Sequence, residues 1–272
     1  MSGLELALRA PVRLPVDAAA LSPGTLLGRP PAEVERLELP VGNARLPLAE
    51  LFTIRRHHDE ALVLRGDLGA FAKLGAGMDA GTLRVEGDAG PCLGVGIRGG
   101  RIEVTGSADV LAGAMMADGL IRIGGNAGDL LGGPLPGERK AMRGGTILVQ
   151  GDAGDRAGER MRRGLIVVLG NAGAYVGANL IAGTVIVQGS CGPDPGYRMR
   201  RGTLLLASPP ERLLATFADC GAHALPWLRL LERHLRGLGI AAEPDVAADG
   251  PYRRLAGDLA ELGLGEILFP AQ

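Results

Sequence analysis

Three consecutive segments of 19 residues in the middle of the chain align without a gap. They read GTILVQGDAGDRAGERMRR, GLIVVLGNAGAYVGANLIA and GTVIVQGSCGPDPGYRMRR, and together they span residues 145–201. The pattern extends back to copies that begin at Gly119, Gly100 and Gly81, to a looser copy from Ala61, and forward to an incomplete copy at Gly202–Ala207. A fixed period of this size predicts a solenoid, in which each repeat forms one turn of the structure.

Each copy opens with the signature of a short strand. If the first Gly of a copy is position 0, then positions 2 and 4 are apolar in every full copy: Leu83/Val85, Ile102/Val104, Ile121/Ile123, Ile147/Val149, Ile166/Val168 and Val185/Val187. This period of two, with mostly β-branched residues, indicates a strand with one buried face. A helix would have to include the regularly spaced glycines, each of which costs about 1 kcal/mol. The pattern therefore predicts a mainly β protein, a parallel right-handed β-helix of about seven to eight coils with a 19-residue period.

The strand of each copy is followed by a predicted corner. Position 6 is always glycine, and we interpret these residues as structural corner glycines: Gly87, Gly106, Gly125, Gly151, Gly170 and Gly189. Position 7 is always short and polar: Asp88, Ser107, Asn126, Asp152, Asn171 and Ser190. Glycine reaches φ > 0 without strain, and short polar side chains bond nearby backbone. A column of such oxygens could bind a cation, but capping of the corners accounts for every member.

Residues 1–60 lie outside the repeat and are predicted to cap its first coil. Leu4–Ala10 alternates as a strand, a short helix is predicted from about Pro31, and two strands are predicted around Gly42-Asn43. Such a cap is needed because the end of a solenoid exposes unpaired strand edges. We divide the chain accordingly into a capping segment (1–60), the repeat (61–207) and a C-terminal segment (208–272).

The C-terminal segment is predicted to be largely helical. Its opening, Ser208-Pro209-Pro210-Glu211, resembles a capping box and predicts a helix to about Cys220. A second helix is predicted at Leu228–Arg236, with an apolar stripe that packs on the rod: Leu228, Leu231, Leu235 and Leu238. A polar loop at Glu243–Gly250 and a strand at Glu266–Phe269 complete this prediction.

Composition excludes several classes of protein. The formal charge of −1 argues against a dedicated nucleic-acid binder, which would be basic. No run of 18 apolar residues is present, so no membrane span is predicted. An odd number of cysteines, three, without a signal peptide predicts a reducing, cytoplasmic location.

Two groups of residues are candidates for contact with a partner. Arginines recur at positions 17 and 18 of the copies, and those in the later copies would form a basic edge: Arg143, Arg162, Arg163, Arg200 and Arg201. The copy that begins at Gly119 carries seven extra residues between Gly132 and Met142, so a loop should project there with these residues: Pro134, Pro136, Glu138, Arg139 and Lys140. A solvated surface is the simpler interpretation of both groups. Contact with a partner is the alternative, because an Arg fork matches carboxylates and prolines reduce the entropy that a loop loses on docking.

No candidate catalytic or metal site is predicted. His57-His58-Asp59 is the only local cluster of ligand-type residues, and adjacent strand residues point to opposite faces. Cys92 and Cys191 occupy different repeat positions and do not stack.

The repeat G-x-[IL]-x-V-x-G-[DN]-A-G-x-x-x-G resembles the Gly-rich domain shared by the C subunit of formylmethanofuran dehydrogenase and the C-terminal domain of glutamate synthase. The flanks are similar to those of the dehydrogenase subunit, both in the strand-and-helix lead Leu4–Ile54 and in the tail GDLAELGLGEIL at Gly257–Leu268. The basic residues are almost all Arg, with Lys73 and Lys140 the exceptions, which points to the bacterial counterpart in the formyltransferase/hydrolase complex of methylotrophs.

The resemblance implies a non-catalytic subunit in a complex of four different subunits. That complex moves a formyl group from formyl-tetrahydromethanopterin to a methanofuran-type carrier and hydrolyses it to formate during formaldehyde oxidation. The resemblance also implies that metal and carrier sites belong to partner subunits, and that this chain binds no cofactor itself. By the same analogy, the basic edge would meet acidic groups of a partner subunit or the oligoglutamate tail of the carrier.

Two rival interpretations remain open. The chain could be a channelling or spacer domain like that of glutamate synthase, with catalytic partners in trans. A hexapeptide acyltransferase is disfavoured, because six-residue subrepeats give turns of 18 residues rather than 19.

Overall fold

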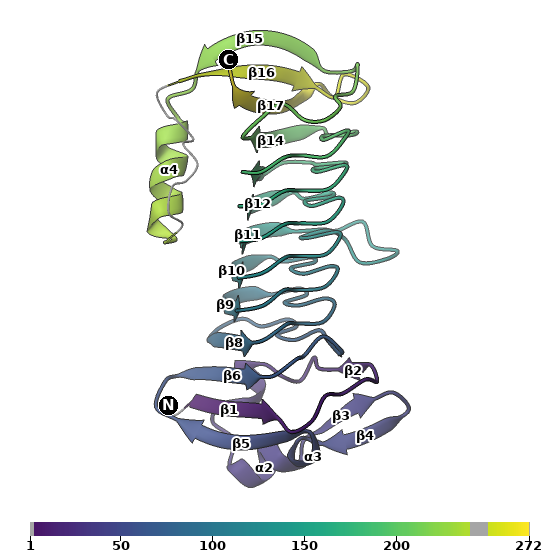
Figure 1. Cartoon of the computed structure of the whole chain (residues 1–272), viewed down its shortest axis with the longest axis vertical. Coiled ribbons are helices and arrows are strands. Elements are labelled where there is room, and N and C mark those ends of the chain that lie inside the picture. Colours follow the sequence, from purple (N-terminus) through teal and green to yellow (C-terminus); the bar gives the residue numbers. More distant parts are fainter. Residues whose placement is uncertain (1–2, 240–249, 272) are drawn as a thin grey trace.

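One long sheet organises the molecule. The computed structural model describes residues 3–239 and 250–271. Thirteen strands are hydrogen-bonded in the order β15-β16-β17-β14-β13-β12-β11-β10-β9-β8-β6-β1-β5, and Figure 1 shows them stacked along the long axis. Their bounds are β1 (Gly3–Leu8), β5 (Phe52–His57), β6 (Ala61–Arg65), β8 (Thr82–Glu86), β9 (Arg98–Val104), β10 (Asp118–Ile123), β11 (Arg143–Val149), β12 (Arg163–Val168), β13 (Thr184–Val187), β14 (Arg201–Leu206), β15 (Ala218–Ala224), β16 (Pro251–Gly257) and β17 (Leu264–Pro270).

The strands from β6 to β14 run parallel and, with the segments that connect them (residues 61–207), form what we call the coil stack. The apolar residues at positions 2 and 4 pair with their counterparts in the next strand, as Ile147 does with Ile166. None of these residues is more than 5% exposed, and all belong to the main core cluster. The prediction that the ladder lies inside is therefore confirmed, and the arrangement is compatible with a β-helix.

The corner residues at position 7 connect successive coils. Asp88 accepts a hydrogen bond from the backbone N–H of Ser107, and Asn126 accepts one from Asp152 across the inserted loop, at 2.7 and 2.8 Å. Ser107, Asp152 and Asn171 accept equivalent bonds. These side chains thus cap backbone N–H groups of the next coil, which is the role that the sequence pattern favoured over cation binding.

The expected positive φ at the corner glycines of position 6 is wrong for most of them. Only Gly87 has a positive φ, of 143°. The others are required by the close approach of the preceding coil, because a Cβ at Gly151 would lie 2.1 Å from Asn126 Oδ1 and 2.8 Å from a backbone oxygen. The capping side chain of one coil therefore fits only because the next coil has a glycine at position 6, such as Gly151 beside Asn126.

Residues 3–60 close one end of the stack. Strand β1 pairs in parallel with β6 and antiparallel with β5, so it covers the first coil as predicted. A smaller sheet, β4 (Ala44–Pro47), β3 (Glu38–Val41), β2 (Val16–Asp17) and β7 (Phe71–Ala72), packs beside it together with three short helices. The helices are α1 (Pro23–Leu26), α2 (Pro31–Arg36) and α3 (Leu48–Leu51). Both the helix at Pro31 and the strands around Gly42 are confirmed.

The predicted helix that ends near Cys220 is wrong. Residues 208–217 form turns that continue the path of the last coil, and β15 follows. The backbone N–H of Glu211 donates to the Cys191 carbonyl, and the N–H of Asp194 donates to the Arg212 carbonyl. The open edge of the preceding coil offers these partners, and this tertiary pairing outweighs the local capping signal.

The C-terminal end closes with antiparallel strands, of which β17 confirms the expected final strand. Strand β17 pairs in parallel with β14 and antiparallel with β16, which pairs with β15. Strands β15 and β16 were not predicted from the sequence, and the expected loop at Glu243–Gly250 lies outside the described residues except for Gly250.

Helix α4 (Leu228–Gly237) covers the outer face of the sheet, alongside the stack in Figure 1. Its apolar stripe packs with outward-facing strand residues such as Val167 and Leu205, so the predicted packing on the rod is confirmed. Burial of Leu228 and Leu235 stabilises this contact by about 2 kcal/mol each. Within residues 3–239 and 250–271, no helix is long and apolar enough to cross a bilayer.

Candidate functional site

Non-glycine residues adopt left-handed backbone at two positions of the coils. At position 11 it is held by Cys92, Leu111, Leu130, Arg156, Tyr175 and Asp194, with φ between 56° and 63°. At position 15 it is held by Met115, Arg160, Asn179 and Arg198. This conformation costs a non-glycine residue about 1–2 kcal/mol. In the last three coils these strained positions carry polar or aromatic residues, which marks a candidate site.

Position 11 was not singled out from the sequence, because no glycine marks it. The only available signal was at position 15, where the copy that begins at Gly81 has Gly96, which also has a positive φ of 65°.

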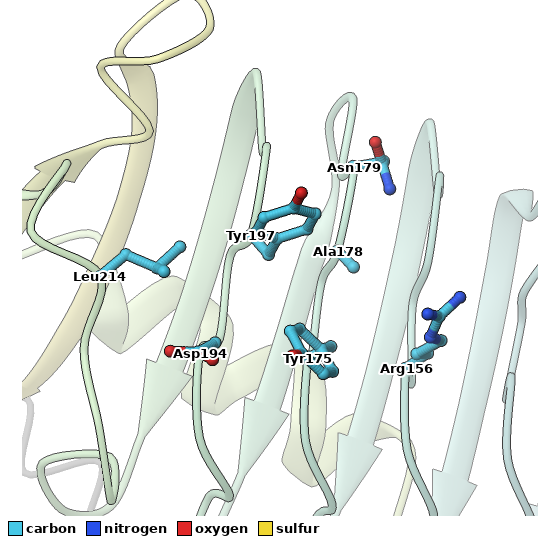
Figure 2. A pocket seen from close by; sticks show the side chains of 7 residues that line it. All are labelled: Arg156, Tyr175, Ala178, Asn179, Asp194, Tyr197 and Leu214. Atoms are coloured by element: carbon cyan, nitrogen blue, oxygen red, sulfur yellow. The ribbon is translucent and has the colours of Figure 1, made fainter.

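An aromatic cavity of about 340 Å³ lies over these coils (Figure 2). Its lining residues come from successive coils: Arg156, Tyr175, Ala178, Asn179, Asp194, Tyr197 and Leu214. The rings of Tyr175 and Tyr197 meet edge to face with centroids 5.9 Å apart, and the Arg156 guanidinium carbon lies 5.9 Å from the centre of the Tyr175 ring. We call this the tyrosine cavity.

Asp194, which lines the tyrosine cavity, is held by an arginine. Arg212 Nε donates to Asp194 Oδ1 at 2.9 Å, and a second guanidinium nitrogen donates to Oδ2. These hydrogen bonds hold the pKa of the Asp194 carboxyl below its usual value. Asp194 therefore stays ionised and serves to fix the incomplete last coil rather than to supply protons.

A second cavity, of about 330 Å³, shares Asn179 with the first. We call it the basic pocket, and it is lined by Arg139, Arg160, Arg162, Asn179, Ile181, Arg198, Arg200 and Glu261. Five of its eight lining residues are arginines and one is acidic, so the chemistry of the pocket suits carboxylates.

The structure divides the predicted basic edge into two parts. Arg162 and Arg200 line the basic pocket. Arg143, Arg163 and Arg201 instead open strands β11, β12 and β14, where Arg143 lies opposite Arg163 in the pairing register. Arg160 and Arg198, which the repeat pattern did not single out, complete the pocket because position 15 lies beside position 17 on the coil surface.

The inserted loop projects from the stack between β10 and β11 (Figure 1). The backbone N–H of Met142 donates to the Gly132 carbonyl at 3.0 Å. The N–H of Met161 makes the equivalent hydrogen bond to the Gly158 carbonyl in a coil without an insertion, so the coil closes normally around the loop. Leu135-Pro136-Gly137-Glu138 forms a turn closed by a 2.9 Å bond, with φ of 81° at Gly137. Pro136 and Lys140 are exposed, as are Glu138 and Arg139 between them, while Pro134 is half-buried at the base.

The other candidates do not assemble into a site. Asp59 pairs with Arg84 at 3.4 Å, and its N–H donates to His57 Nδ1. Across the described residues, no group of three or more His, Cys, Asp or Glu side chains is placed to hold a metal ion.

The three thiols are free, and their reactivity should differ sharply. Burial raises the pKa of Cys191 to about 12 and also raises that of Cys92, whereas Cys220 is exposed. We expect iodoacetamide at about pH 8 to modify Cys220 in the folded chain and to leave Cys191 intact until denaturant is added, because the thiolate is the reactive form. Mass spectrometry of the Cys220→Ser variant provides the control, because the rapid modification should disappear. If Cys191 is modified at the same rate in folded and unfolded protein, its assignment to the interior is wrong.

Together, these observations define a mainly β protein with a long, mostly parallel sheet, compatible with a β-helix, and with two cavities over its last coils. No protein-family model matches the chain. The sequence is 34% identical over 90 residues to the C subunit of the molybdenum-containing formylmethanofuran dehydrogenase 1 of Methanothermobacter wolfeii. It is 46% identical over 59 residues to the C subunit of the formyltransferase/hydrolase complex Fhc of Methylorubrum extorquens. These alignments cover 32% and 22% of this chain, and the chain spans 22% of the length of each of these curated relatives.

Structural similarity extends over the whole molecule. A chain in the crystal structure of the formyltransferase/hydrolase complex FhcABCD of Methylorubrum extorquens, solved with methylofuran, superimposes with a TM-score of 0.90 and 39% identity. The match covers 98% of this chain and 100% of that one. The chain belongs to the family formed by the C subunits of formylmethanofuran dehydrogenase and of the formyltransferase/hydrolase complex.

Proposed function

We propose that this chain is the non-catalytic scaffold subunit of a hetero-oligomeric formyltransferase/hydrolase complex. The observation that carries the proposal is the match over 98% of the chain to a subunit of FhcABCD at 39% identity. The complex would transfer a formyl group from formyl-tetrahydromethanopterin to a methanofuran-type carrier and hydrolyse it to formate. Carrier and metal would be held by partner subunits.

The chemistry of the described residues supports a scaffold. The short polar residues of the coil corners are occupied in backbone capping, and Asp194 and Glu261 are held ionised by arginines. Cys191 is buried at a pKa of about 12, which disfavours a thiolate nucleophile.

We also infer the finer architecture and the compartment. The chain would be a right-handed β-helix of seven to eight coils with a 19-residue period, an inference supported by pairs such as Ile166 with Val185 and Leu83 with Ile102. Three free cysteines, of which Cys220 is exposed, favour the reducing cytoplasm.

Purification tests the proposed function. We expect a tagged full-length chain, expressed in its native host, to co-elute with companion subunits, and the complex to hydrolyse formyl-carrier. The same chain purified alone is expected to show no turnover with formyl-tetrahydromethanopterin or formyl-carrier. Turnover by the metal-free isolated chain would contradict the scaffold role, and co-elution of glutamate synthase catalytic chains would favour the rival interpretation.

A further inference from the structure

The basic pocket contains the same pair of arginines twice, two coils apart. Arg198 and Arg200 occupy positions 15 and 17 of the coil that begins at Gly183. Arg160 and Arg162 occupy these positions in the coil that begins at Gly145. The coil between them contributes Asn179 and Ile181 to the lining of the pocket, and neither side chain carries a charge.

The first pair shows what such a pair binds. Glu261, from the turn between β16 and β17, accepts hydrogen bonds from Arg198 Nε at 2.9 Å through Oε1 and from Arg200 Nε at 3.3 Å through Oε2. One arginine thus holds each oxygen of a single carboxylate. The side chain of Glu261 is only 14% exposed, and the hydrogen bonds from Arg198 hold its pKa below the usual value. The pair therefore works as a carboxylate clamp that fixes a protein segment.

The second pair has the same backbone geometry. Arg160 and Arg198 both have left-handed backbone, with φ of 55° and 56°. The N–H groups of Arg162 and Arg200 donate to the preceding coil at the same distance, 2.8 Å. Equivalent backbone directs the two side chains of each pair in equivalent ways, so the second pair is built to take a carboxylate as well.

Charge around the second pair is not balanced in the described part of the chain. Arg160 lies 3.6 Å from Glu159 of its own coil, and Glu159 is shared with Arg156 at 3.5 Å. No ion pair of Arg162 or of Arg139, which faces the same pocket from the inserted loop, is found among the described residues.

We propose that Arg160 and Arg162, assisted by Arg139, form a second carboxylate clamp that binds an acidic segment of a partner protein. This inference rests on the proposed role in a hetero-oligomer. A protein segment is favoured because the equivalent clamp already binds one. The pocket also shares the lining residue Asn179 with the tyrosine cavity, whose rings offer a bound peptide aromatic contacts.

The clamp is tested on the full-length chain with a fluorescein-labelled hexaglutamate peptide, followed by fluorescence anisotropy at low salt. Hexaglutamine serves as the neutral peptide. The double variant Arg160→Gln/Arg162→Gln removes the clamp. Arg36→Gln/Arg45→Gln removes the same charge from two exposed arginines at the other end of the molecule. Both double variants change surface arginines, and melting temperatures of all variants are measured to check that they fold.

We expect hexaglutamate to bind and hexaglutamine not to bind. The clamp variant should bind at least about fivefold more weakly, the control variant at most about twofold more weakly, and the difference should shrink at about 0.5 M salt. Glu261→Gln should bind hexaglutamate more tightly than the unaltered chain, because it removes the carboxylate from the first clamp.

Three results would overturn the proposal. The first is equal binding by the clamp variant and the unaltered chain, and the second is an equal loss in the clamp and control variants. The third concerns competition by citrate and by unlabelled hexaglutamate. If citrate displaces the labelled peptide at the same or a lower concentration of carboxylate groups than hexaglutamate does, the clamp binds free carboxylates rather than a peptide. None of these measurements involves companion subunits, so failure here is distinct from failure of the co-elution test above.

Discussion

Replacing Val149 with aspartate is expected to leave no stably folded chain. Val149 is fully buried in β11, where it pairs with Ile123 on one side and Val168 on the other, both also buried. A carboxylate there would lose its water and gain no partner, because the interior ladder is apolar throughout. Together with the lost burial of valine, we expect destabilisation of at least about 4 kcal/mol, a large share of the stability of a typical domain.

The neighbouring residue provides a matched control. Gln150 is exposed, and only its backbone N–H takes part in the coil, by donating to the Ile123 carbonyl. Gln150→Asp should change the free energy of unfolding by no more than about 0.5 kcal/mol. Circular dichroism and thermal melting compare the two variants, and a Val149→Asp chain that is soluble and melts normally would refute the assigned interior.

Removal of the inserted loop is expected to abolish assembly while folding is retained. The sequence pattern alone suggests excision of Gly133–Arg139, but Gly133 accepts a bond from the Met115 N–H and donates to the Leu130 carbonyl, so it belongs to the coil. The better excision removes Pro134–Lys140, also seven residues, with Ala141→Gly to supply a left-handed residue at position 15. The isolated chain should then melt at or above its original temperature, since a shorter loop has less entropy to lose.

The loss of assembly follows if the loop contacts a companion subunit, which we propose because its proline-stiffened turn is exposed and charged. Excision also removes Arg139 from the basic pocket, so Arg139→Gln with the loop intact separates the two effects. Gel filtration of the co-expressed subunits measures assembly with the excised chain and with the Arg139→Gln chain. If the excised chain assembles as fully as the original, the loop is only a surface insertion.

Repeating chemistry made the coil stack predictable. Apolar residues at fixed spacing indicate which face of an element is buried. This spacing predicted the strand ladder, the position of the insertion and the apolar stripe by which α4 packs on the sheet. The N-terminal strands and helix followed from local turn signals at Pro31 and Gly42 for the same reason: local preference and global fold agree there.

The rest depends on pairing that a local pattern does not contain. Residues 208–217 carry helix signals but are bound by the edge of the preceding coil. The left-handed arginines at position 15 are imposed by the coil path rather than by glycine, and Glu261 reaches Arg198 from 63 residues away. The sequence singled out only Arg139, Arg162 and Arg200 among the residues that line the basic pocket, and the tyrosine cavity became visible only in three dimensions.

Both ends of the coil stack finish in antiparallel pairs, β1 with β5 and β17 with β16, while everything between them is parallel. A reversed strand cannot accept another coil in the parallel register, so neither end invites end-to-end growth into fibres. The distance between the two capping ends is then set by the number of copies alone, in steps of about 4.8 Å. A chain built this way is a molecular ruler: gain or loss of a single copy would move whatever binds at one end relative to the other by one fixed increment, without redesign of either end.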